Sequence, residues 1–329
     1  MRRPVLAALA WLATALPAAA LCTGTSLLDR LTPDDMARFD AAVAGIPHAE
    51  GLIFRASRGA AQIVLIGTMH IHDPRLDAIE AAAAPHLAEA DLLLLEMTPA
   101  EEGALMGYMA ANPDFAFITE GDTLPVLLGE DWDAVAAAAR DRQIPGFVAA
   151  KSRPWYLMLS LSIPPCAMGD LIEQRRGLDH RLMTLAERRG LPMQALEPFD
   201  TLFGLFTDMP MEQQLDYLRM SVLDPELTEE MFVATLDLYF AGEIARTWEL
   251  SRIALRFSPE LDLAEMEQVM DQFETRLLAE RNQAWIPVIE AAAARHDDIV
   301  VAAGAAHLPG DQGVLQLLEQ RGWRVERLD

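Results

Sequence analysis

Two apolar stretches of the sequence are each followed by the same short motif, a glycine with a histidine three positions later. Residues 63–66 form a continuous apolar run, typical of a strand buried on both faces, and the run stops at Gly67 before His70. A second apolar run, residues 299–303, is followed by the second motif, which ends on His307. Ligands bind at the carboxyl ends of strands in open α/β sheets, so the pattern predicts both histidines at such an edge.

Two further predicted strands end on a carboxylate. Residues 92–95 are four leucines that end on Glu96, and residues 193–196 end on Glu197. An alanine-rich helix predicted over 77–90 joins the strand before His70 to the strand before Glu96. A strand–helix–strand order implies a parallel crossover. We therefore expect the four polar strand ends to lie at one edge of the sheet.

The remaining pattern is mostly helical. Residues 52–56 and 62–66 predict a hairpin, and 323–328 an edge strand. A long helical run from 263 to 295 is expected to kink at Pro287. We predict one α/β domain over residues 21–329, with a central, mostly parallel sheet and a helical insertion over about 99–176 and 199–296.

Composition narrows the choice of partners. The chain has 329 residues, of which 52% are hydrophobic, and a formal net charge of −24. This acidity argues against nucleic acid and against an anionic membrane surface as partners. Lys151 is the single lysine, so a Schiff-base mechanism has little support.

The N-terminal residues have the composition of a signal peptide. Two arginines precede an apolar stretch and a small-residue cleavage site near Ala20, so residues 1–20 are expected to be removed. The apolar run is short for a membrane span, and no later stretch predicts one. We expect a secreted, bacterial periplasmic protein with no integral span after signal removal. Leu21 is a poor lipobox residue, which argues against lipoprotein anchoring at Cys22.

The chain contains two cysteines, Cys22 and Cys166. In an oxidising compartment they can pair, and the sequence leaves equally open that both remain thiols.

The four strand-end side chains suggest two kinds of chemistry. His70, Glu96, Glu197 and His307 suit a divalent metal such as Zn, Mn or Co, which would polarise a carbonyl and acidify a bound water. The same groups can work without a metal, with a histidine as general base and a glutamate as its orienting partner.

Other polar residues have weaker support. His72 is two residues after His70, so which of the two acts is open. Asp179 and His180 sit at a predicted helix start, where capping is the expected role of Asp179. Arg281 lies on a long helix, where it is either solvated or placed to stabilise negative charge developing on a carbonyl.

A methionine-rich middle region offers a different function. Methionine lines adaptable apolar grooves, although plain helical core is the simpler interpretation. A binding protein for haem or for a peptide, without catalysis, is therefore an alternative. The sequence has no Cys-x-x-Cys-His and no serine-hydrolase elbow, His-Glu-x-x-His or Walker motif.

Several segments together resemble the TraB/GumN family, which includes the TIKI proteins and is distantly similar to erythromycin esterase and ChaN-like folds. They are GTMH, LLLLEM, GLDHRLMTLAERRGLPMQALEPFD, ERNQAW and VVAAGAAHLPGDQGVLQLLEQRGW. The resemblance covers roughly residues 45–329, and GAAHLPGDQG is its most specific part.

The resemblance implies an α/β core of two related halves whose Gly-x-x-His motifs converge on one site. By matched position, His70 and His307 are the paired motif histidines, Glu96 is the motif glutamate and Arg281 belongs to the family's Arg-Asn helix. Together with the four polar strand ends, this predicts that His70, Glu96 and His307 hold a metal ion or its water, with Glu197 and Arg281 in support. TIKI members are described as metal-dependent proteases, esterase relatives use a His and a Glu to activate water, and ChaN-like relatives bind haem. We therefore expect a metal-dependent, peptidase-like hydrolase acting on a peptide or small ester, with a metal-free esterase as another alternative.

Overall fold

A computed structural model describes residues 22, 24–222, 224–257 and 263–329. The predicted signal peptide, residues 1–20, lies outside these described residues.

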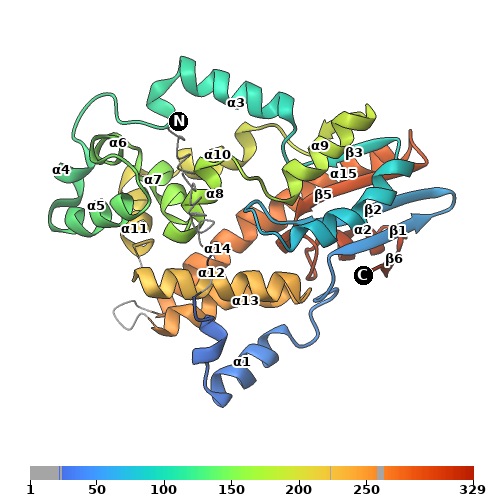
Figure 1. Ribbon diagram of the computed structural model, residues 1–329, viewed down its shortest axis with the longest axis horizontal. Helices are drawn as coiled ribbons and strands as arrows, with labels where there is room; N and C mark the ends of the chain where they lie inside the picture. The colour runs from blue at the N-terminus through green and yellow to red at the C-terminus, as the bar shows by residue number, and fades with distance from the viewer. Residues whose placement is uncertain (1–21, 23, 223, 258–262) are drawn as a thin grey trace, which may run out of the picture.

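A six-stranded mixed sheet forms the centre of the α/β part of the molecule (Figure 1). Its strand order is β4-β3-β5-β2-β1-β6. The four strands from β4 to β2 are parallel, and β1 pairs antiparallel with both β2 and β6. The strands are β1 Ile53–Arg58, β2 Ala61–Thr68, β3 Leu92–Leu95, β4 Met193–Ala195, β5 Asp298–Gly304 and β6 Arg324–Arg327.

The predicted fold class, hairpin and edge strand are confirmed. The structure adds that β5, the last parallel strand in the sequence, lies between β2 and β3. This insertion places the second Gly-x-x-His motif between the strand that ends before His70 and the strand that ends before Glu96.

Helices cover both faces of the sheet because alternate residues of the central strands point to opposite sides. Ile63 and Leu65 pack with α15 (Glu280–Ala293) and α16 (Val314–Glu319). Val64 and Ile66 pack on the other face with α2 (Leu76–Glu89) and α9 (Leu178–Arg189). Burial on both faces explains the continuous apolar strands of the sequence.

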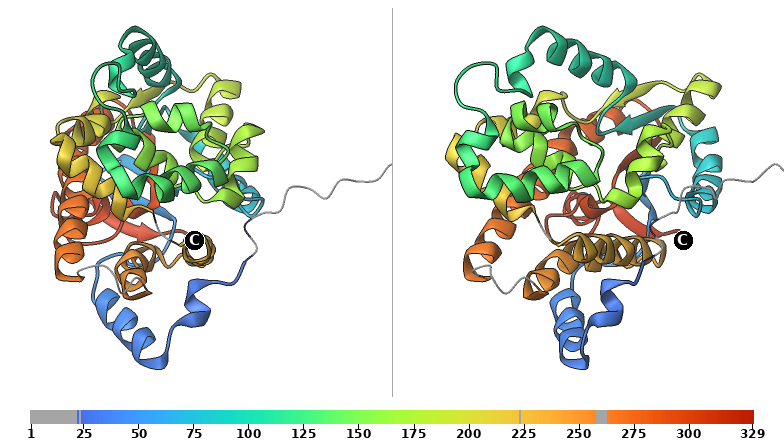
Figure 2. Two further views of the ribbon diagram at one scale, coloured as in Figure 1. Left: turned by 90° about the vertical axis from the view of Figure 1, so that its left-hand side faces the viewer. Right: turned by 60° about the vertical axis from the view of Figure 1, so that its left-hand side comes forward.

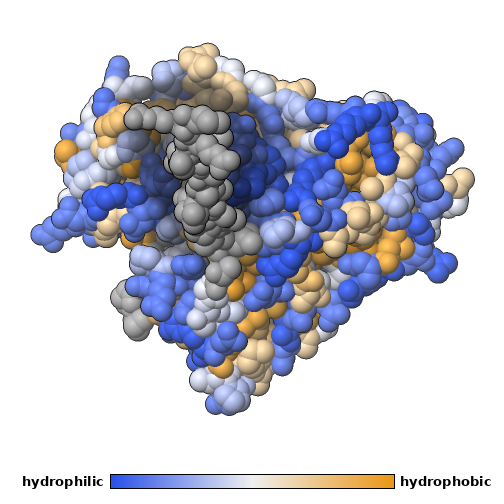
Figure 3. Space-filling model, in the orientation of Figure 1, coloured by the Kyte–Doolittle hydropathy of each residue, from blue (hydrophilic) through white to orange (hydrophobic). Residues whose placement is uncertain are grey.

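The other helices form a second part of the molecule beside the sheet, with two cores of its own (Figures 1 and 2). They are α1 Pro33–Val43, α3 Pro99–Ala111, α4 Leu124–Leu128, α5 Trp132–Asp141, α6 Gly146–Lys151, α7 Pro154–Leu161, α8 Met168–Ile172, α10 Asp200–Thr207, α11 Met211–Met220, α12 Pro225–Phe240, α13 Ile244–Ala254 and α14 Leu263–Glu274. On the face shown in Figure 3 the surface is hollowed between this helical part and the sheet, and hydrophilic side chains surround the hollow.

The long C-terminal helical run is interrupted by a π-helical turn that the sequence pattern did not predict. α14 ends at Glu274, the turn covers Thr275–Ala279, and α15 contains Pro287 in its interior. The kink expected at Pro287 stays a prediction. π-helical turns are frequent at functional sites, and this one ends two residues before Arg281.

Cys22 and Cys166 form a disulfide, which settles the alternative that the sequence left open. The bridge ties the start of the described chain to the segment just before α8. Of the helices in the described part of the chain, none is both long and apolar enough to cross a membrane.

Candidate functional site

The four predicted strand-end residues lie along one edge of the sheet. Glu197 follows β4, Glu96 follows β3, His307 follows β5 and His70 follows β2. Since the strands are neighbours in that order and parallel, their carboxyl ends meet at the same edge. The topology therefore brings together side chains that are separated by up to 237 positions, from residue 70 to residue 307.

Glycine in each Gly-x-x-His motif allows this close approach. A Cβ on Gly67 would lie 3.0 Å from both Ala305 Cβ and Leu308 Cδ1, so the first motif packs directly on the turn of the second. A Cβ on Gly304 would lie 3.3 Å from Glu96 Oε1, which instead accepts a 2.7 Å hydrogen bond from Gly304 N–H.

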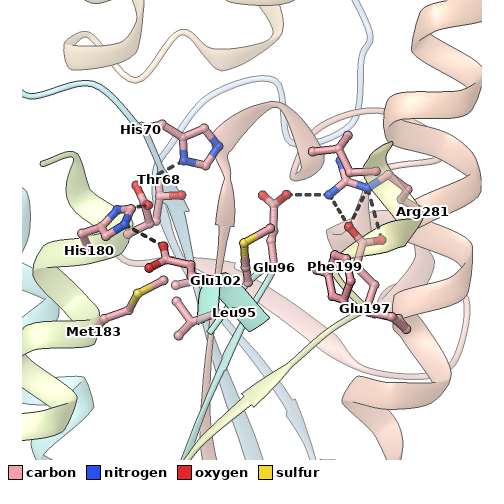
Figure 4. Close-up of a pocket in the computed structure, with 15 residues that line it drawn as sticks. Thr68, His70, Leu95, Glu96, Glu102, His180, Met183, Glu197, Phe199 and Arg281 are labelled. Atoms are coloured by element: carbon pink, nitrogen blue, oxygen red, sulfur yellow. Dashed lines mark hydrogen bonds and ion pairs between the residues drawn. The ribbon is translucent and has the colours of Figure 1, made fainter. Parts of the chain in front are cut away.

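Arg281 joins the two glutamates in a buried ion network (Figure 4). Its Nη2 donates to Glu96 Oε2 at 2.6 Å and to Glu197 Oε1 at 2.5 Å, and its Nε donates to Glu197 Oε1 at 2.9 Å. The Arg281 side chain is only 7% exposed. Trp285 Nε1 donates to the second oxygen of Glu197 at 2.9 Å. The network fixes both carboxylates, and a supporting role of Arg281 in the site stays a prediction.

The π-helical turn before α15 helps to place this arginine. Arg281 Nη1 donates back to Leu277 O, inside the turn, at 3.1 Å. Burial disfavours the charged guanidinium, but Glu197 and Glu96 outweigh this and raise the pKa of Arg281. The side chain is thus a permanent positive charge between two carboxylates.

His307 lies behind Glu96 and Arg281, and its tautomer follows from its partners. Asn282 Nδ2 donates to Gln312 O at 2.9 Å, which fixes the amide so that Asn282 Oδ1 faces His307 Nδ1 at 2.6 Å. An oxygen there accepts, so His307 carries its proton on Nδ1. Its Nε2 then accepts from Arg281 Nη1 at 3.3 Å and lies 3.9 Å from Glu96 Oε1.

The buried imidazole is neutral. Desolvation lowers the pKa of His307 to about 4, and the charges of Arg281 and His70 add to this against the opposite effect of Glu96. Glu96 is the reverse case. Burial raises the pKa of a carboxyl, but His307, which is protonated at the low pH where Glu96 titrates, acts with His70, Arg281 and the Gly304 amide to lower the pKa of Glu96 to about 2.

His70 is held from the other side by Asp179. The Nδ1 atom of His70 lies 3.2 Å from Asp179 Oδ1, and the His70 side chain is 67% exposed. Asp179 Oδ1 meets His70 at ion-pair distance without the angles of a hydrogen bond. Desolvation lowers the pKa of His70, yet the Asp179 carboxylate, with Glu96, overrides it and raises the pKa to about 9. His70 is therefore charged at neutral pH.

A second histidine and a glutamate extend this side of the site. His180 Nδ1 lies 2.7 Å from Asp179 Oδ2, and His180 Nε2 lies 2.8 Å from Glu102 Oε1 on α3. Gly177, just before α9, approaches the His70 loop so closely that a Cβ there would lie 2.2 Å from Met69 O. The start of α9 thus packs closely against the loop that carries His70.

The two networks face each other across a cavity of about 190 Å³ (Figure 4). His70 and Asp179 line one side, and Glu96, Glu197 and Arg281 line the other. Its apolar lining comes from Leu95, Met97, Met183, Phe199 and Leu202. His307 does not line it, because Glu96 and Arg281 lie in front of the buried ring.

The structure thus sorts the predicted residues. His70, Glu96, Glu197 and Arg281 reach the cavity, whereas His307 supports them from behind. His72 is turned away and contacts Arg181, with Nδ1 3.1 Å from Nη2.

Asp179 was missed as a site residue. The expectation that it caps the helix is wrong, since the N-cap of α9 is Gly177 and Asp179 lies buried in the first turn. The adjacent acidic residue and histidine of the GLDH segment were the available signal in the sequence.

The donors do not fit a divalent ion as they lie. Among the described residues, no group of three or more His, Cys, Asp or Glu side chains has the arrangement of a metal site. Both oxygens of Glu96 accept hydrogen bonds, and the Arg281 cation lies 3.3 Å from the His307 nitrogen that would bind an ion at roughly 2 Å. Metal binding by His70, Glu96 and His307 stays a prediction, and we derive no step through a metal.

The molecule is thus an α/β protein with one composite polar site, at the sheet edge where its two Gly-x-x-His motifs meet. A family model for the TraB/PrgY/gumN family matches residues 52–327. The chain belongs to that family. Comparisons with curated proteins and with solved structures gave no significant match.

Proposed function

We propose that this protein is a hydrolase that cleaves a peptide or ester bond with water, in a reaction driven by His70 and Glu96. The strongest support is that His70 and Glu96, which carry opposite charges and are held by different partners, face each other across one cavity. His70 is cationic and oriented by Asp179, whereas Glu96 is anionic and fixed by Arg281 and Gly304. Pairs of titratable groups whose surroundings push their pKa values apart are typical of acid–base sites.

The charges of Glu96 and His70 indicate which residue acts as base and which as acid. Glu96 orients a water molecule and takes its proton as the hydroxyl adds to the carbonyl carbon. His70 donates a proton to the leaving nitrogen or oxygen, so the acyl carbon gains OH and the leaving group gains H. Glu96 is then protonated and His70 is neutral, and proton transfer from Glu96 to His70 restores the starting state.

Arg281 and His307 act through Glu96. The guanidinium holds the carboxylate in place and contributes positive charge near the oxygen that becomes negative. Neutral His307 accepts a hydrogen bond from that guanidinium and fixes its orientation. Both are positioning residues.

The surroundings suggest an uncharged or cationic substrate. Four carboxylates, Glu96, Glu102, Asp179 and Glu197, line the cavity against the two cations Arg281 and His70, which leaves the lining with a net negative charge. Secretion to the periplasm remains part of the proposal, supported by the sequence of residues 1–20 and consistent with the Cys22–Cys166 disulfide, a bond typical of oxidising compartments.

A cleavage assay tests the proposal. Protein lacking residues 1–20 and a histidine tag would be incubated with an octapeptide library and with p-nitrophenyl acetate, before and after dialysis against a chelator. We expect turnover that survives chelation and falls about 10²–10⁴-fold in Glu96→Gln and His70→Gln. His72→Gln is the matched control and should keep full activity.

Each other outcome favours a named alternative. Turnover that is lost on chelation and restored by Zn, Mn or Co would support the metal-dependent form. Peptide or haem binding without turnover would support a binding protein.

A further inference from the structure

A second cavity, of about 490 Å³, is lined by four aromatic rings together with polar and charged side chains, among them Asp114, Arg153 and Asp200. Tyr108, Phe115, Trp155 and Phe199 belong to it, and Phe199 also lines the first cavity. The rings are in contact, with centroids 5.2 Å apart for Tyr108–Phe115 and for Phe115–Trp155. The two cavities are therefore neighbours that share Phe199.

One buried polar side chain that lines this aromatic cavity has a hydrogen-bond acceptor without a donor. Gln214 is only 5% exposed, and its Nε2 donates to Met209 O at 2.9 Å. That bond fixes the orientation of the amide, so Oε1 is the free end. Oε1 accepts no hydrogen bond from the residues that the structure describes and has almost no accessible surface, so a donor in the cavity pairs with it only when the side chain turns toward the cavity. A buried acceptor without a donor is costly, so a ligand that brings an N–H or O–H into the cavity would be favoured.

The ligand that matches this lining is a ring with one hydrogen-bond donor. Tyrosine and tryptophan side chains combine a large apolar body with a single O–H or N–H that needs a partner when buried. Phenylalanine has the ring but leaves Gln214 Oε1 unpaired. The chemistry thus distinguishes three otherwise similar side chains.

Helix α3 gives the distance between the two cavities. Glu102 lines the first and Tyr108 lines the second. Six residues along a helix span roughly 9 Å, which equals about three residues of an extended peptide. The aromatic cavity therefore lies about three residues from the bond that the first cavity would hold.

We propose that the aromatic cavity is a specificity subsite for a tyrosine or tryptophan side chain of a peptide substrate, about three residues from the cleaved bond. The inference rests on the proposed function for its link to cleavage. Binding of the aromatic side chain itself is independent of it.

Gly204 allows a clean test. It lies on α10, lines the aromatic cavity, and a Cβ added there would meet nothing within 4 Å. Gly204→Leu should fill the subsite without a clash. Gly103→Leu is the matched control, because Gly103 also lies on a helix with open space around it but outside both cavities.

The experiment has a binding arm and a cleavage arm. Calorimetry with N-acetyl-tyrosinamide and N-acetyl-phenylalaninamide should show about 10-fold tighter binding of the tyrosine compound to the wild type. Gly204→Leu should abolish the binding of both, Gly103→Leu should change neither, and Gln214→Met should erase the preference. Octapeptide libraries with tyrosine, tryptophan or phenylalanine fixed at one position should show the same order in kcat/KM.

The two arms separate the two hypotheses. Tyrosine preference in binding, with no cleavage of any library, would sustain the subsite and reject the hydrolase. Equal binding of both amides, or binding that Gly204→Leu leaves intact, would overturn the subsite whatever the cleavage result.

Discussion

Asp179 Oδ1 lies 3.2 Å from His70 Nδ1, so a residue in the first turn of α9 holds the histidine that follows β2. Asp179 is itself buried and ionised, since His180 and His70 outweigh desolvation and hold its pKa well below the usual range. Its charge therefore keeps His70 protonated at neutral pH. The contact supplies the proton donor of the proposed reaction.

Removing the Asp179 charge should shift the pH profile of hydrolysis. In the wild type the rate should fall as pH rises through about 9, where His70 loses its proton. In Asp179→Asn this descending limb should move toward the ordinary histidine pKa of roughly 6.5, and the rate at pH 7 should drop about 4-fold because only about a quarter of His70 is then protonated. Profiles of kcat/KM between pH 5 and 10 measure this, and an unmoved limb would contradict the role of Asp179.

Arg281→Met should destabilise the protein strongly. It would leave Glu96 and Glu197 buried without their cation, which costs about 3–5 kcal/mol in comparable buried pairs. Arg219→Met is a matched control, because its partners Asp131 and Asp216 are more than half exposed, and it should cost under about 1 kcal/mol. Urea unfolding at pH 7 compares them, and equal midpoints would speak against the network.

His307 should make stability depend on pH. Its folded pKa of about 4 lies below the unfolded value of 6.5, so between these values the unfolded chain binds the extra proton. The unfolding free energy contributed by this group is therefore present above pH 6.5 and is lost as pH falls toward 4. The loss should be on the order of 1–3 kcal/mol. Comparing wild type with His307→Gln at pH 7 and 4.5 isolates it, and parallel losses in both proteins would refute it.

The disulfide should contribute to stability through the unfolded chain. Cys22 and Cys166 are 144 positions apart, so reducing the bond frees a long loop and should lower the unfolding free energy by about 2–4 kcal/mol. Thermal melts with and without reductant should therefore differ for the wild type and coincide for the double variant Cys22→Ser, Cys166→Ser. Identical wild-type melts would show that the bridge is not formed or not stabilising.

The sheet edge was predictable because a strand that is buried on both faces consists of apolar residues along its whole length. Strands β2, β3 and β5 are buried on both faces, so each reads as an apolar run, and the polar residue that ends it stands out. Glu96, His70 and His307 were found in this way. The position of β5 between β2 and β3 depends on packing of the whole chain, which no local pattern reports.

Other parts of the site depend on contacts that leave no local signature. Asp179 sits where a capping residue is expected, and only the close approach of Gly177 to the His70 loop shows its actual partner. The π-helical turn before Arg281 looks like ordinary helix in the sequence. Gln214 stands out only once its surroundings are aromatic and its acceptor is unpaired.

The decisive measurement is the rate of peptide hydrolysis as a function of pH, on metal-depleted wild type beside Glu96→Gln and His70→Gln. We expect undiminished wild-type turnover after metal removal, a decline as pH passes about 9, and loss of turnover in both variants. Turnover that requires added Zn, Mn or Co, or that persists in Glu96→Gln, would contradict the proposed reaction.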